Sequence, residues 1–584
     1  MALKVWIPFI SNNRNQGLDE SSQVTAGTCT YTAGGVLGNA ATFNGSSQYQ
    51  RFNLVYGKQM TFACFAKFNS FNCHLMDGRD SNGGGYQPMY VTASYIQAGG
   101  AATFPNLSYN FSTGVWYHLC VVETGEKVKL YVNGEFVTQA DHVGIAGSNQ
   151  FTIGCRYSNA NYFNGQVNDV RIYDHCLSAK EIKEISKGLV LHYKLNDANM
   201  TATTNLIQDY DTSFESIATG NTTLFTNQLN SGTIKIVSNV QGHSKCLQVH
   251  SNGGNNRCYR YFNTTAGTYV VSVDYYNQST EYLPPLRVEL NGGGYSWFGI
   301  SENTLLDDYG DWKRYYLKMT ITATTNVYLF FMCQNGQDAY FDNVQMEKGE
   351  YPTEYTKTTR SAGAIYDCSG YKNDGTIGGA PTMYGNTMKY DCALNLAGSS
   401  YIRAGKPAKV KDQITVACWA YMADWGTFEA RLLSCTEGGG WNFEPCFPPG
   451  GGRMNFAMVT GASSNTYKSA SGTTVLSTLS GWHHFAGTYD GFKTKIYIDG
   501  VLEGTNNAYT TKTPIFYSSS NGIFVGAEAG TNETTPVGQY FNNPISDVRI
   551  YGRALSADDI LELFHTRASI DNNGNFYCGE LKES

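Results

Sequence analysis

Apolar and polar residues alternate in short runs along most of this chain, which is the pattern of half-buried β-strands. Residues 127–136 alternate around an Asn-Gly pair at 133–134, and residues 494–502 alternate around an Asp-Gly pair at 499–500. Both dipeptides accept the positive φ angles of a two-residue type I′ turn. The two stretches therefore predict β-hairpins.

One sequence motif occurs twice in the chain. Residues 163–182 and 541–560 share eleven identities without a gap, including Asp-Val-Arg-Ile-Tyr. Further matches precede them in the same order: 61–64 with 415–418, 116–118 with 482–484, and 129–134 with 495–500. Ordered matches separated by loops of changing length indicate a duplicated β-rich domain.

Each copy is predicted to close with one short helix. Ser178 and Glu181 in the first copy, and Ser556 and Asp559 in the second, have the spacing of a capping box. Apolar residues follow on one side of each helix. We expect both helices to be structural covers of their sheets.

The second copy is predicted to be split by an insertion. Residues 188–195 resemble the opening strand at 3–9, but the next expected element, 365–375, comes only after a long segment with its own alternation. In that segment Tyr269, Val271, Val273 and Tyr275 occupy every second position, the spacing of one strand face, which predicts a further sandwich. The expected domains are copy 1 at 1–187, copy 2 at 188–198 and 360–568, the insert at 199–359, and a hairpin-like tail at 569–584.

Composition excludes some classes of partner. The chain of 584 residues has a net charge of -7 and only 15% charged residues, so we expect no nucleic-acid partner. No apolar stretch is long enough for membrane insertion. The first residues lack the apolar core of a signal peptide, and the cysteines show no CxxC pair. We therefore expect a reduced protein made in the host cytoplasm.

Four motifs carry a resemblance to a known family. Asp367-Cys-Ser-Gly-Tyr-Lys-Asn-Asp-Gly375, residues 481–484, residues 496–500 and residues 547–556 resemble the laminin-G-like, concanavalin A-like jelly roll family. Copy 1 matches without the opening run near Gly17. The resemblance implies two such sandwiches.

The insert carries a second resemblance. Its opening (205–207 and 213–215) and its closing segment (340–347) resemble galactose-binding-like carbohydrate-binding modules. The expected fold is thus all-β: two concanavalin A-like jelly roll sandwiches plus one inserted galactose-binding-like β-sandwich, with short capping helices only.

Catalytic chemistry is not expected. A glucanase on this fold needs two carboxylates, usually as E-x-D-x-x-E, and no such run is present. Asp558, Asp559 and Glu562 come nearest, but they fall on a predicted helix, where a solvated face is the simpler interpretation. His118 and the pair at 483–484 are interpreted as residues at the edge of the core. We expect no enzyme activity and no required cofactor.

Sugar binding needs aromatic rings beside amide or carboxylate groups. Three regions offer that mixture, although packing of long loops is the alternative at each. The candidate carbohydrate-binding residues are Trp425, Trp441, Asn442, Phe443 and Glu444 in copy 2, Tyr295 and Trp297 in the insert, and Tyr86 in copy 1, where Asp77-Gly-Arg-Asp80 lies nearby.

Structural calcium is common in both resembled families and prefers clustered oxygen ligands. Asp367, Asn373 and Asp374 are one candidate set, and Glu215 with Asp342 in the insert is another. In the first set the alternative role is to fix a turn through side-chain to backbone hydrogen bonds.

The whole chain resembles structural proteins of bacteriophage particles, through its Met-Ala-Leu-Lys-Val-Trp start and its Asp-Asn-Asn-Gly-Asn-Phe tail. The resemblance implies a virion protein of a tail, baseplate or fibre, with cell-surface glycan and other virion proteins as partners, and a homo-oligomer or attachment to a symmetric assembly. Two alternatives stay open: a purely structural connector, and an accessory binding region of a glycan-processing system.

Overall fold

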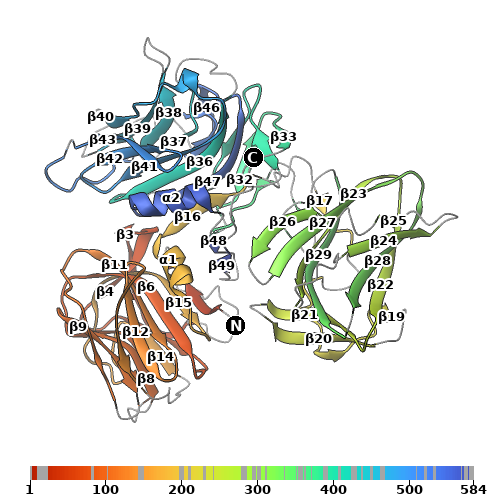
Figure 1. Ribbon diagram of the computed structural model, residues 1–584. Coiled ribbons are helices and arrows are strands. Elements are labelled where there is room, and N and C mark those ends of the chain that lie inside the picture. The colour runs from red at the N-terminus through yellow and green to blue at the C-terminus, as the bar shows by residue number, and fades with distance from the viewer. Residues whose placement is uncertain are drawn as a thin grey trace.

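Alternating apolar residues form antiparallel strands, and the strands form paired sheets in three separate lobes (Figure 1). Each pair of sheets encloses its own apolar core. The expectation of an all-β protein with two short helices is confirmed. The computed structural model describes residues 3–9, 24–80, 85–100, 103–142, 150–195, 203–207, 212–227, 232–240, 243–277, 286–291, 297–298, 304–309, 312–334, 336–349, 352, 355, 359–360, 364–369, 371, 373–385, 392–405, 410–422, 430–435, 439–446, 452–460, 467–507, 509–517, 522–530, 534–566, 569–570 and 576–577.

Copy 1 is a sandwich of two sheets, which we call its junction sheet and its distal sheet. The junction sheet has the order β13 (Glu135–Asp141), β12 (Lys127–Val132), β11 (Trp116–Glu123), β6 (Met60–Phe68), β15 (Asn164–Tyr173), β4 (Gly38–Asn44), β3 (Thr30–Gly35), and β1 (Leu3–Ile7) also pairs with β15. The distal sheet has the order β10 (Asn106–Ser108), β9 (Tyr95–Gly100), β8 (Gly85–Val91), β7 (Cys73–Arg79), β14 (Gln150–Ile153), β5 (Tyr49–Asn53), β2 (Val24–Thr28).

Copy 2 repeats this strand order in both sheets, with one further strand, β31 (Ala364–Ile365), at the edge of its distal sheet. Its junction sheet runs β43 (Val501–Asn506), β42 (Thr494–Ile498), β41 (Gly481–Tyr489), β36 (Ile414–Met422), β47 (Pro544–Tyr551), β34 (Cys392–Asn395), β33 (Thr382–Gly385), with β16 (Leu189–Tyr193) paired to β47. Its distal sheet runs β40 (Tyr467–Ser471), β39 (Arg453–Val459), β38 (Trp441–Cys446), β37 (Leu433–Cys435), β44 (Phe524–Val525), β35 (Tyr401–Arg403), β32 (Gly375–Gly378), β31 (Ala364–Ile365). Strand β16 therefore pairs within copy 2 although it precedes the insert in the chain.

The segment between β16 and β31 forms its own sandwich. One sheet runs β18 (Gly220–Asn221), β20 (Gly232–Val240), β21 (His243–Ser251), β29 (Asp338–Lys348), β23 (Gly267–Asn277), β27 (Trp312–Ile321), β26 (Thr304–Tyr309). The other runs β19 (Thr226–Asn227), β22 (Asn255–Thr264), β28 (Thr325–Gln334), β24 (Leu286–Asn291), β25 (Trp297–Phe298). The alternating Tyr269, Val271, Val273 and Tyr275 all face the core between these sheets, as predicted.

Short elements complete the chain. Three two-stranded ladders pair β17 (Thr203–Thr204) with β30 (Thr359–Arg360), β45 (Glu528–Ala529) with β46 (Pro536–Gly538), and β48 (Ser569–Ile570) with β49 (Phe576–Tyr577). Helices are α1 (Ala179–Ser186), α2 (Ala557–His565) and the 3-10 turn η1 (Leu476–Thr478). Neither α-helix is long enough to span a bilayer, and the described part of the chain holds no other candidate for that role.

Local sequence signals account for the turns and helix ends. Asn133 and Gly134 have φ angles of 54° and 86°, and Asp499 and Gly500 have 49° and 78°, as the predicted type I′ turns require. Both capping boxes are formed, by Ser178 with Glu181 and by Ser556 with Asp559. These predictions are confirmed because each depends on neighbouring residues only.

The repeated Asp-Val-Arg-Ile-Tyr motif forms a bulge in β15 and in β47. Asp169 and Asp547 have positive φ angles of 53° and 48°. Each accepts a hydrogen bond from the arginine two residues later, at 3.1 Å from Arg171 Nε and 2.9 Å from Arg549 Nε. The valine and isoleucine of the motif face the core. The charged residues face the other side, as predicted, but they are buried there.

Their burial results from contact between the two copies, whose junction sheets face each other across α1 and α2 (Figure 1). Tyr371 of copy 2 donates a hydrogen bond to Asp169 of copy 1 at 2.9 Å and packs edge-on against Trp6, with ring centroids 5.3 Å apart. Val36 of copy 1 lies in the apolar core cluster of copy 2. The chain passes directly from α1 into β16 through Gly188, so no separate linker joins the sandwiches.

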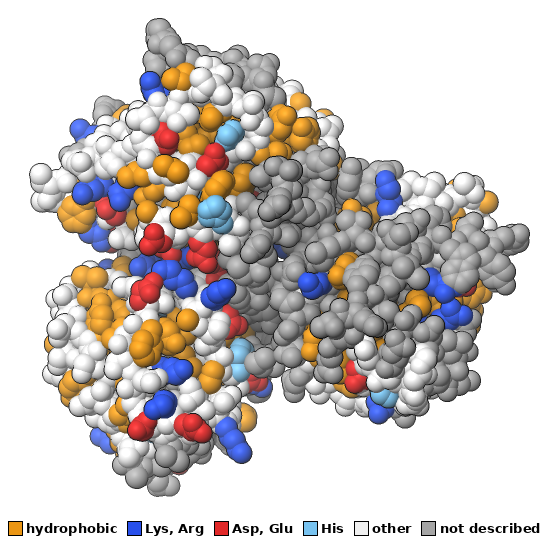
Figure 2. Space-filling model, in the orientation of Figure 1, with side chains coloured by type: hydrophobic (Ala, Val, Ile, Leu, Met, Phe, Trp, Pro, Cys, Tyr) orange, Lys and Arg blue, Asp and Glu red, His pale blue; other side chains and the backbone are white. Residues whose placement is uncertain are grey.

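Positively and negatively charged side chains, blue and red in Figure 2, gather where copy 1 meets copy 2. Lys183 of α1 pairs with Asp559 of α2 at 3.2 Å, and Lys187 pairs with Glu562 of α2 at 3.0 Å. The expectation that Asp559 and Glu562 form a solvated helix face is therefore wrong. They connect α2 to α1, a contact that the sequence of α2 alone cannot reveal.

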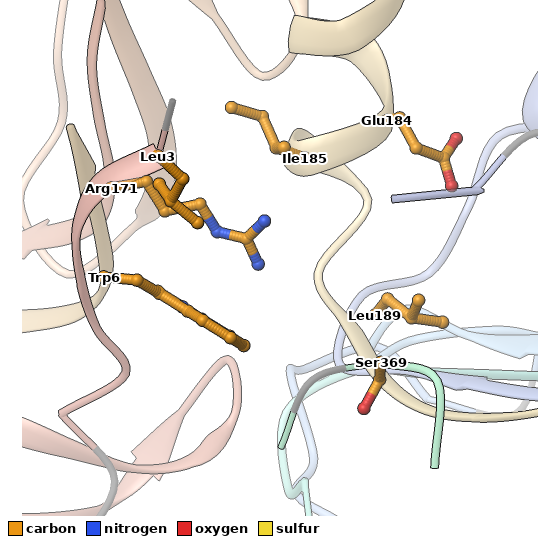
Figure 3. Close-up of a pocket in the computed structure, with 7 residues that line it drawn as sticks. All are labelled: Leu3, Trp6, Arg171, Glu184, Ile185, Leu189 and Ser369. Atoms are coloured by element: carbon orange, nitrogen blue, oxygen red, sulfur yellow. The ribbon is translucent and has the colours of Figure 1, made fainter. Parts of the chain in front are cut away.

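A small cavity of about 20 Å³ lies within this junction (Figure 3). Trp6 and Arg171 of copy 1 face it from one side, with the Arg171 guanidinium pointing inward, while Leu189 and Ser369 of copy 2 border it from the other. A space of this size holds about one water molecule. The cavity is therefore too small for a sugar.

Candidate functional site

The predicted sugar-binding tryptophan of copy 2 is a core residue. Trp441 begins β38, is only 1% exposed, and packs with Phe456 in the copy 2 core. Phe443 is completely buried in the same core. The expectation that both stand on an exposed loop is wrong, because both lie in β38, which pairs with β37 and β39 in the distal sheet. An indole with this exposure cannot stack on a sugar.

The neighbouring residues on β38 point to the other face. Asn442 is 7% exposed, and Glu444 forms an ion pair with Arg431. Both therefore lie on the outer face of the copy 2 distal sheet. Their predicted role in sugar binding stays a prediction, although the carboxylate of Glu444 already has a cationic partner within the chain.

The remaining aromatic candidates divide into two groups. Tyr86 is completely buried between the sheets of copy 1, stacked on Phe62 with centroids 5.6 Å apart, so the interpretation of Tyr86 as a sugar contact is wrong. Trp425 and Tyr295 lie outside the described residues, as does the side chain of Trp297, whose backbone begins β25.

The first calcium candidates fix the opening turn of copy 2. The buried carboxylate of Asp367 accepts four hydrogen bonds, from the backbone N–H groups of His192, Ser369 and Asn373 and from the Ser369 hydroxyl. Asp374 Oδ1 accepts the Asp367 N–H at 2.9 Å. The turn-fixing alternative accounts for every one of these contacts, and a cation would have to displace them.

The second calcium candidates have separate partners. Asp342 is buried beside His243, with Oδ2 2.6 Å from Nδ1, and burial raises the pKa of Asp342 to about 7. Glu215 is exposed and accepts the Lys245 N–H at 3.2 Å. Within the described part of the chain, no three His, Cys, Asp or Glu side chains come together as a metal-binding group. Calcium binding by Glu215 and Asp342 stays a prediction.

A row of polar side chains crosses the outer face of the copy 1 distal sheet. Register places Asn106 of β10 beside Gln97 of β9, Gln97 beside Tyr90 of β8, and Tyr90 beside His74 of β7. Gln97 donates to Asn106 Oδ1 at 3.2 Å, and the Tyr90 and His74 rings lie 4.8 Å apart. Four strands thus bring two amides, a half-buried phenol ring and an imidazole into one line.

An ion pair adjoins this row on β7. Arg79 holds Asp77 through two hydrogen bonds, at 2.8 Å from Oδ1 and 3.0 Å from Oδ2. Arg79 Nη2 also lies 2.8 Å from His74 Nε2. His74 Nε2 also lies 3.0 Å from Gln87 Oε1, so it has a donor on one side and an acceptor on the other. Nδ1 is buried and has no hydrogen-bond partner within the described residues.

Two more guanidinium groups complete the face. Arg51 of β5 donates to Thr152 Oγ1 at 3.2 Å and to Asn159 Oδ1 at 3.0 Å. Arg156 lies over the Tyr157 ring, 4.9 Å from its centroid. Tyr157 also lies beneath Arg79, at 5.3 Å. Aromatic rings, amides and guanidinium groups therefore share one sheet face, the mixture that sugar hydroxyls and sugar ring faces require.

The sequence indicates only part of this face. Asp77 and Arg79 lie in the segment noted beside Tyr86, whereas no sequence motif singles out Tyr90, Gln97 or Asn106. The period-2 alternation of β8 and β9 could have indicated that Tyr90 and Gln97 share a face. Their alignment with His74 depends on strand register, which a bulge in β7 shifts between His74 and Met76.

Acid is expected to destabilise copy 1 through His74. Burial, together with the charges of Arg79 and Arg156, lowers the pKa of His74 to about 4 against the opposing effects of Asp77 and of the hydrogen bond to Gln87. The unfolded chain takes up this proton near pH 6.5, so stability is present above that pH and is lost between about 6.5 and 4. We expect a loss of about 2 kcal/mol between pH 7 and pH 5 from this group.

The measurement is urea unfolding of the protein and of His74→Gln at both pH values. The variant should lose less stability on acidification, because it lacks the titrating imidazole. Equal losses in the two proteins would show that His74 does not cause the acid sensitivity.

The fold and this face define a jelly roll protein of the lectin type, with two sandwiches of one kind. The chain belongs to the concanavalin A-like lectin/glucanases superfamily, whose laminin G model matches residues 40–183 and 396–561, more than half of the chain. A comparison with curated protein sequences found no match.

Solved structures with a similar fold include several sugar- and receptor-binding domains. Domain 4 of AbnA, an extracellular arabinanase from Geobacillus stearothermophilus in complex with arabinotriose, is 21% identical over 31% of this chain and 97% of its own, with a TM-score of 0.27. The botulinum neurotoxin serotype D binding domain is 12% identical over 57% and 96%, with a TM-score of 0.27. The Ruminococcus gnavus sialidase module CBM40, bound to sialyllactose, is 14% identical over 27% and 84%, with a TM-score of 0.21.

Proposed function

We propose that the protein binds glycans without cleaving them, through the outer face of the copy 1 distal sheet. The observation that carries the proposal is the row from Asn106 to His74, an aligned set of amides beside the half-buried ring of Tyr90. Membership of a superfamily of lectins and glucanases is consistent with such a site. The junction sheets are occupied by each other and by α1 and α2, which leaves the distal sheets for external ligands.

Replacement of Tyr90 by alanine is expected to weaken glycan binding at least about tenfold, because a stacked sugar loses its aromatic contact. The measurement is a glycan array with the intact protein, followed by calorimetric titration of the glycans that it binds. Phe136→Ala is the matched control, since Phe136 is an exposed aromatic residue of the other sheet of copy 1.

Three outcomes distinguish the possibilities. Loss of binding in Tyr90→Ala but not in Phe136→Ala supports the assigned face. Equal binding by both variants contradicts it. Release of reducing sugar from any bound glycan would contradict the proposal of a non-enzymatic protein.

We propose further that this binding serves a virion protein of a phage tail, baseplate or fibre that contacts host-surface glycans. The support is the resemblance of the whole chain to such proteins, together with a duplicated rigid module suited to repeated attachment. The test is immunogold labelling of purified particles with serum against the chain. Labelled particles without any glycan signal would favour the second candidate, a structural connector of the particle.

A further inference from the structure

The two copies carry equivalent positions on their distal sheets, and the backbone hydrogen bonds identify them. His74 and Arg431 each donate their N–H to the loop that follows the neighbouring strand, at Asn161 O and Gln539 O. In copy 1 the strand partner of His74 on β8 is Tyr90, whereas in copy 2 Arg431 forms an ion pair with Glu444 of β38.

A second pair of positions follows from the glycines after β14 and β44. Gly154 donates its N–H to Leu75 O, and Gly526 donates to Leu432 O. Counting two residues on from each glycine makes Arg156 of copy 1 equivalent to Glu528 of copy 2.

In copy 2 these positions form a closed ion cluster. Arg431 pairs with Glu444 on one side and with Glu528 on the other, the latter at 2.9 Å. The Arg431 side chain is only 6% exposed. Two carboxylates of the chain thus neutralise this buried guanidinium.

Copy 1 has a different set of charges at these positions. His74 stands where copy 2 has Arg431, and Arg156 stands where copy 2 has Glu528. Arg79 is neutralised by Asp77, but the hydrogen bonds of Arg51 and Arg156 within the described residues go only to neutral acceptors, the closest being Asn159 Oδ1 for Arg51 at 3.0 Å.

A hydrogen-bond donor also remains unused at this place. Nε of Arg156 is buried without a partner in the described structure. Buried N–H groups are nearly always satisfied in folded proteins, so this N–H indicates a missing acceptor.

We infer that the copy 1 face binds an acidic sugar, whose carboxylate or sulfate oxygens accept hydrogen bonds from the guanidinium groups of Arg51 and Arg156. Guanidinium groups bind such anions through paired hydrogen bonds, and the neighbouring Tyr90 ring and amides contact the rest of the sugar. The inference rests on the proposed glycan-binding function and specifies its ligand class.

The test compares three ligands by calorimetric titration: oligogalacturonate, sulfated dextran fragments and unmodified dextran fragments. We expect at least one acidic ligand to bind at least tenfold more tightly than neutral dextran. Whether the uronate or the sulfated ligand binds identifies the source of the anionic group.

Arg156→Glu places in copy 1 the carboxylate that copy 2 has, and it should reduce acidic-ligand binding at least tenfold. Arg156→Gln should weaken acidic-ligand binding by a smaller factor. It replaces Arg156→Glu as the test if that variant folds poorly. Lys58→Glu is the matched control, because it makes the same charge change at an exposed residue of copy 1.

The possible failures are distinct. If a neutral glycan binds as well as the acidic ones and Arg156→Glu is without effect, the inference is overturned while glycan binding stands. If Lys58→Glu weakens binding as much as Arg156→Glu, the attraction is a general charge effect and the assigned site is wrong. If no carbohydrate on the array or in titration binds, the proposed function fails as well.

Discussion

Replacement of Trp441 by alanine is expected to lower the free energy of unfolding of copy 2 by about 3–5 kcal/mol. Trp441 is 1% exposed and packs in the core with Phe456, so its removal leaves a cavity that the surrounding strands can fill only partly. Urea unfolding followed by fluorescence measures the change. Glycan binding by the folded fraction should not change.

Trp482→Ala serves as the control for this prediction. Trp482 is in β41 of the same copy, but it is only partly buried, beside Tyr384 and Tyr421. We expect a smaller loss of stability there. If Trp441→Ala instead left stability unchanged and abolished glycan binding, the core position of Trp441 would be contradicted.

Replacement of Lys187 by methionine is expected to cost about 3–5 kcal/mol, the usual result of removing one partner of a buried ion pair. The ammonium lies 2.6 Å from Glu184 Oε2 and 3.0 Å from Glu562 Oε2, and the Lys187 side chain is 1% exposed. Burial alone would lower the pKa of Lys187, but the charges of Glu184 and Glu562 raise it above its ordinary value. Without the ammonium, the buried Glu184 carboxylate has no counter-charge.

The same helix provides the controls. Lys183→Met removes a partly exposed ammonium that pairs with the exposed Glu135 and with Asp559, and it should cost less than Lys187→Met because solvent screens its charge. Lys187→Met combined with Glu184→Gln should recover much of the lost stability, because it removes both charges. Thermal unfolding compares the variants, and small-angle scattering shows whether the copies separate. A loss in Lys183→Met equal to that in Lys187→Met would contradict the role of burial.

The fold was predictable because its signals are local and repeated. The Asn-Gly and Asp-Gly turns, the two capping boxes and the alternation of Tyr269 to Tyr275 depend on residues close in sequence, and each is observed. Because the domain is duplicated, each strand motif occurs twice in the same order, which supports the predicted strand order in both copies.

The candidate site was much less predictable, because it is assembled across strands. Asn106, Gln97, Tyr90 and His74 come from four strands, and only their register brings them into line. The composition around Trp441 suggested a loop, while the pairing of β38 with β37 and β39 made it a core strand. The Lys187 contact with Glu562 depends on two helices that are far apart in the chain.

Because α1 passes directly into β16, the orientation of copy 1 relative to copy 2 is fixed, and this limits which surfaces the protein can contact. Gly552 approaches Val36 so closely that a β-carbon at residue 552 would lie 1.7 Å from the Val36 carbonyl oxygen, so the two sandwiches are held in tight back-to-back contact. Their outward sheets then point in opposite directions, and one flat surface cannot meet both. A protein built in this way is suited to bridging two separate objects, with copy 1 turned toward one and copy 2 toward the other.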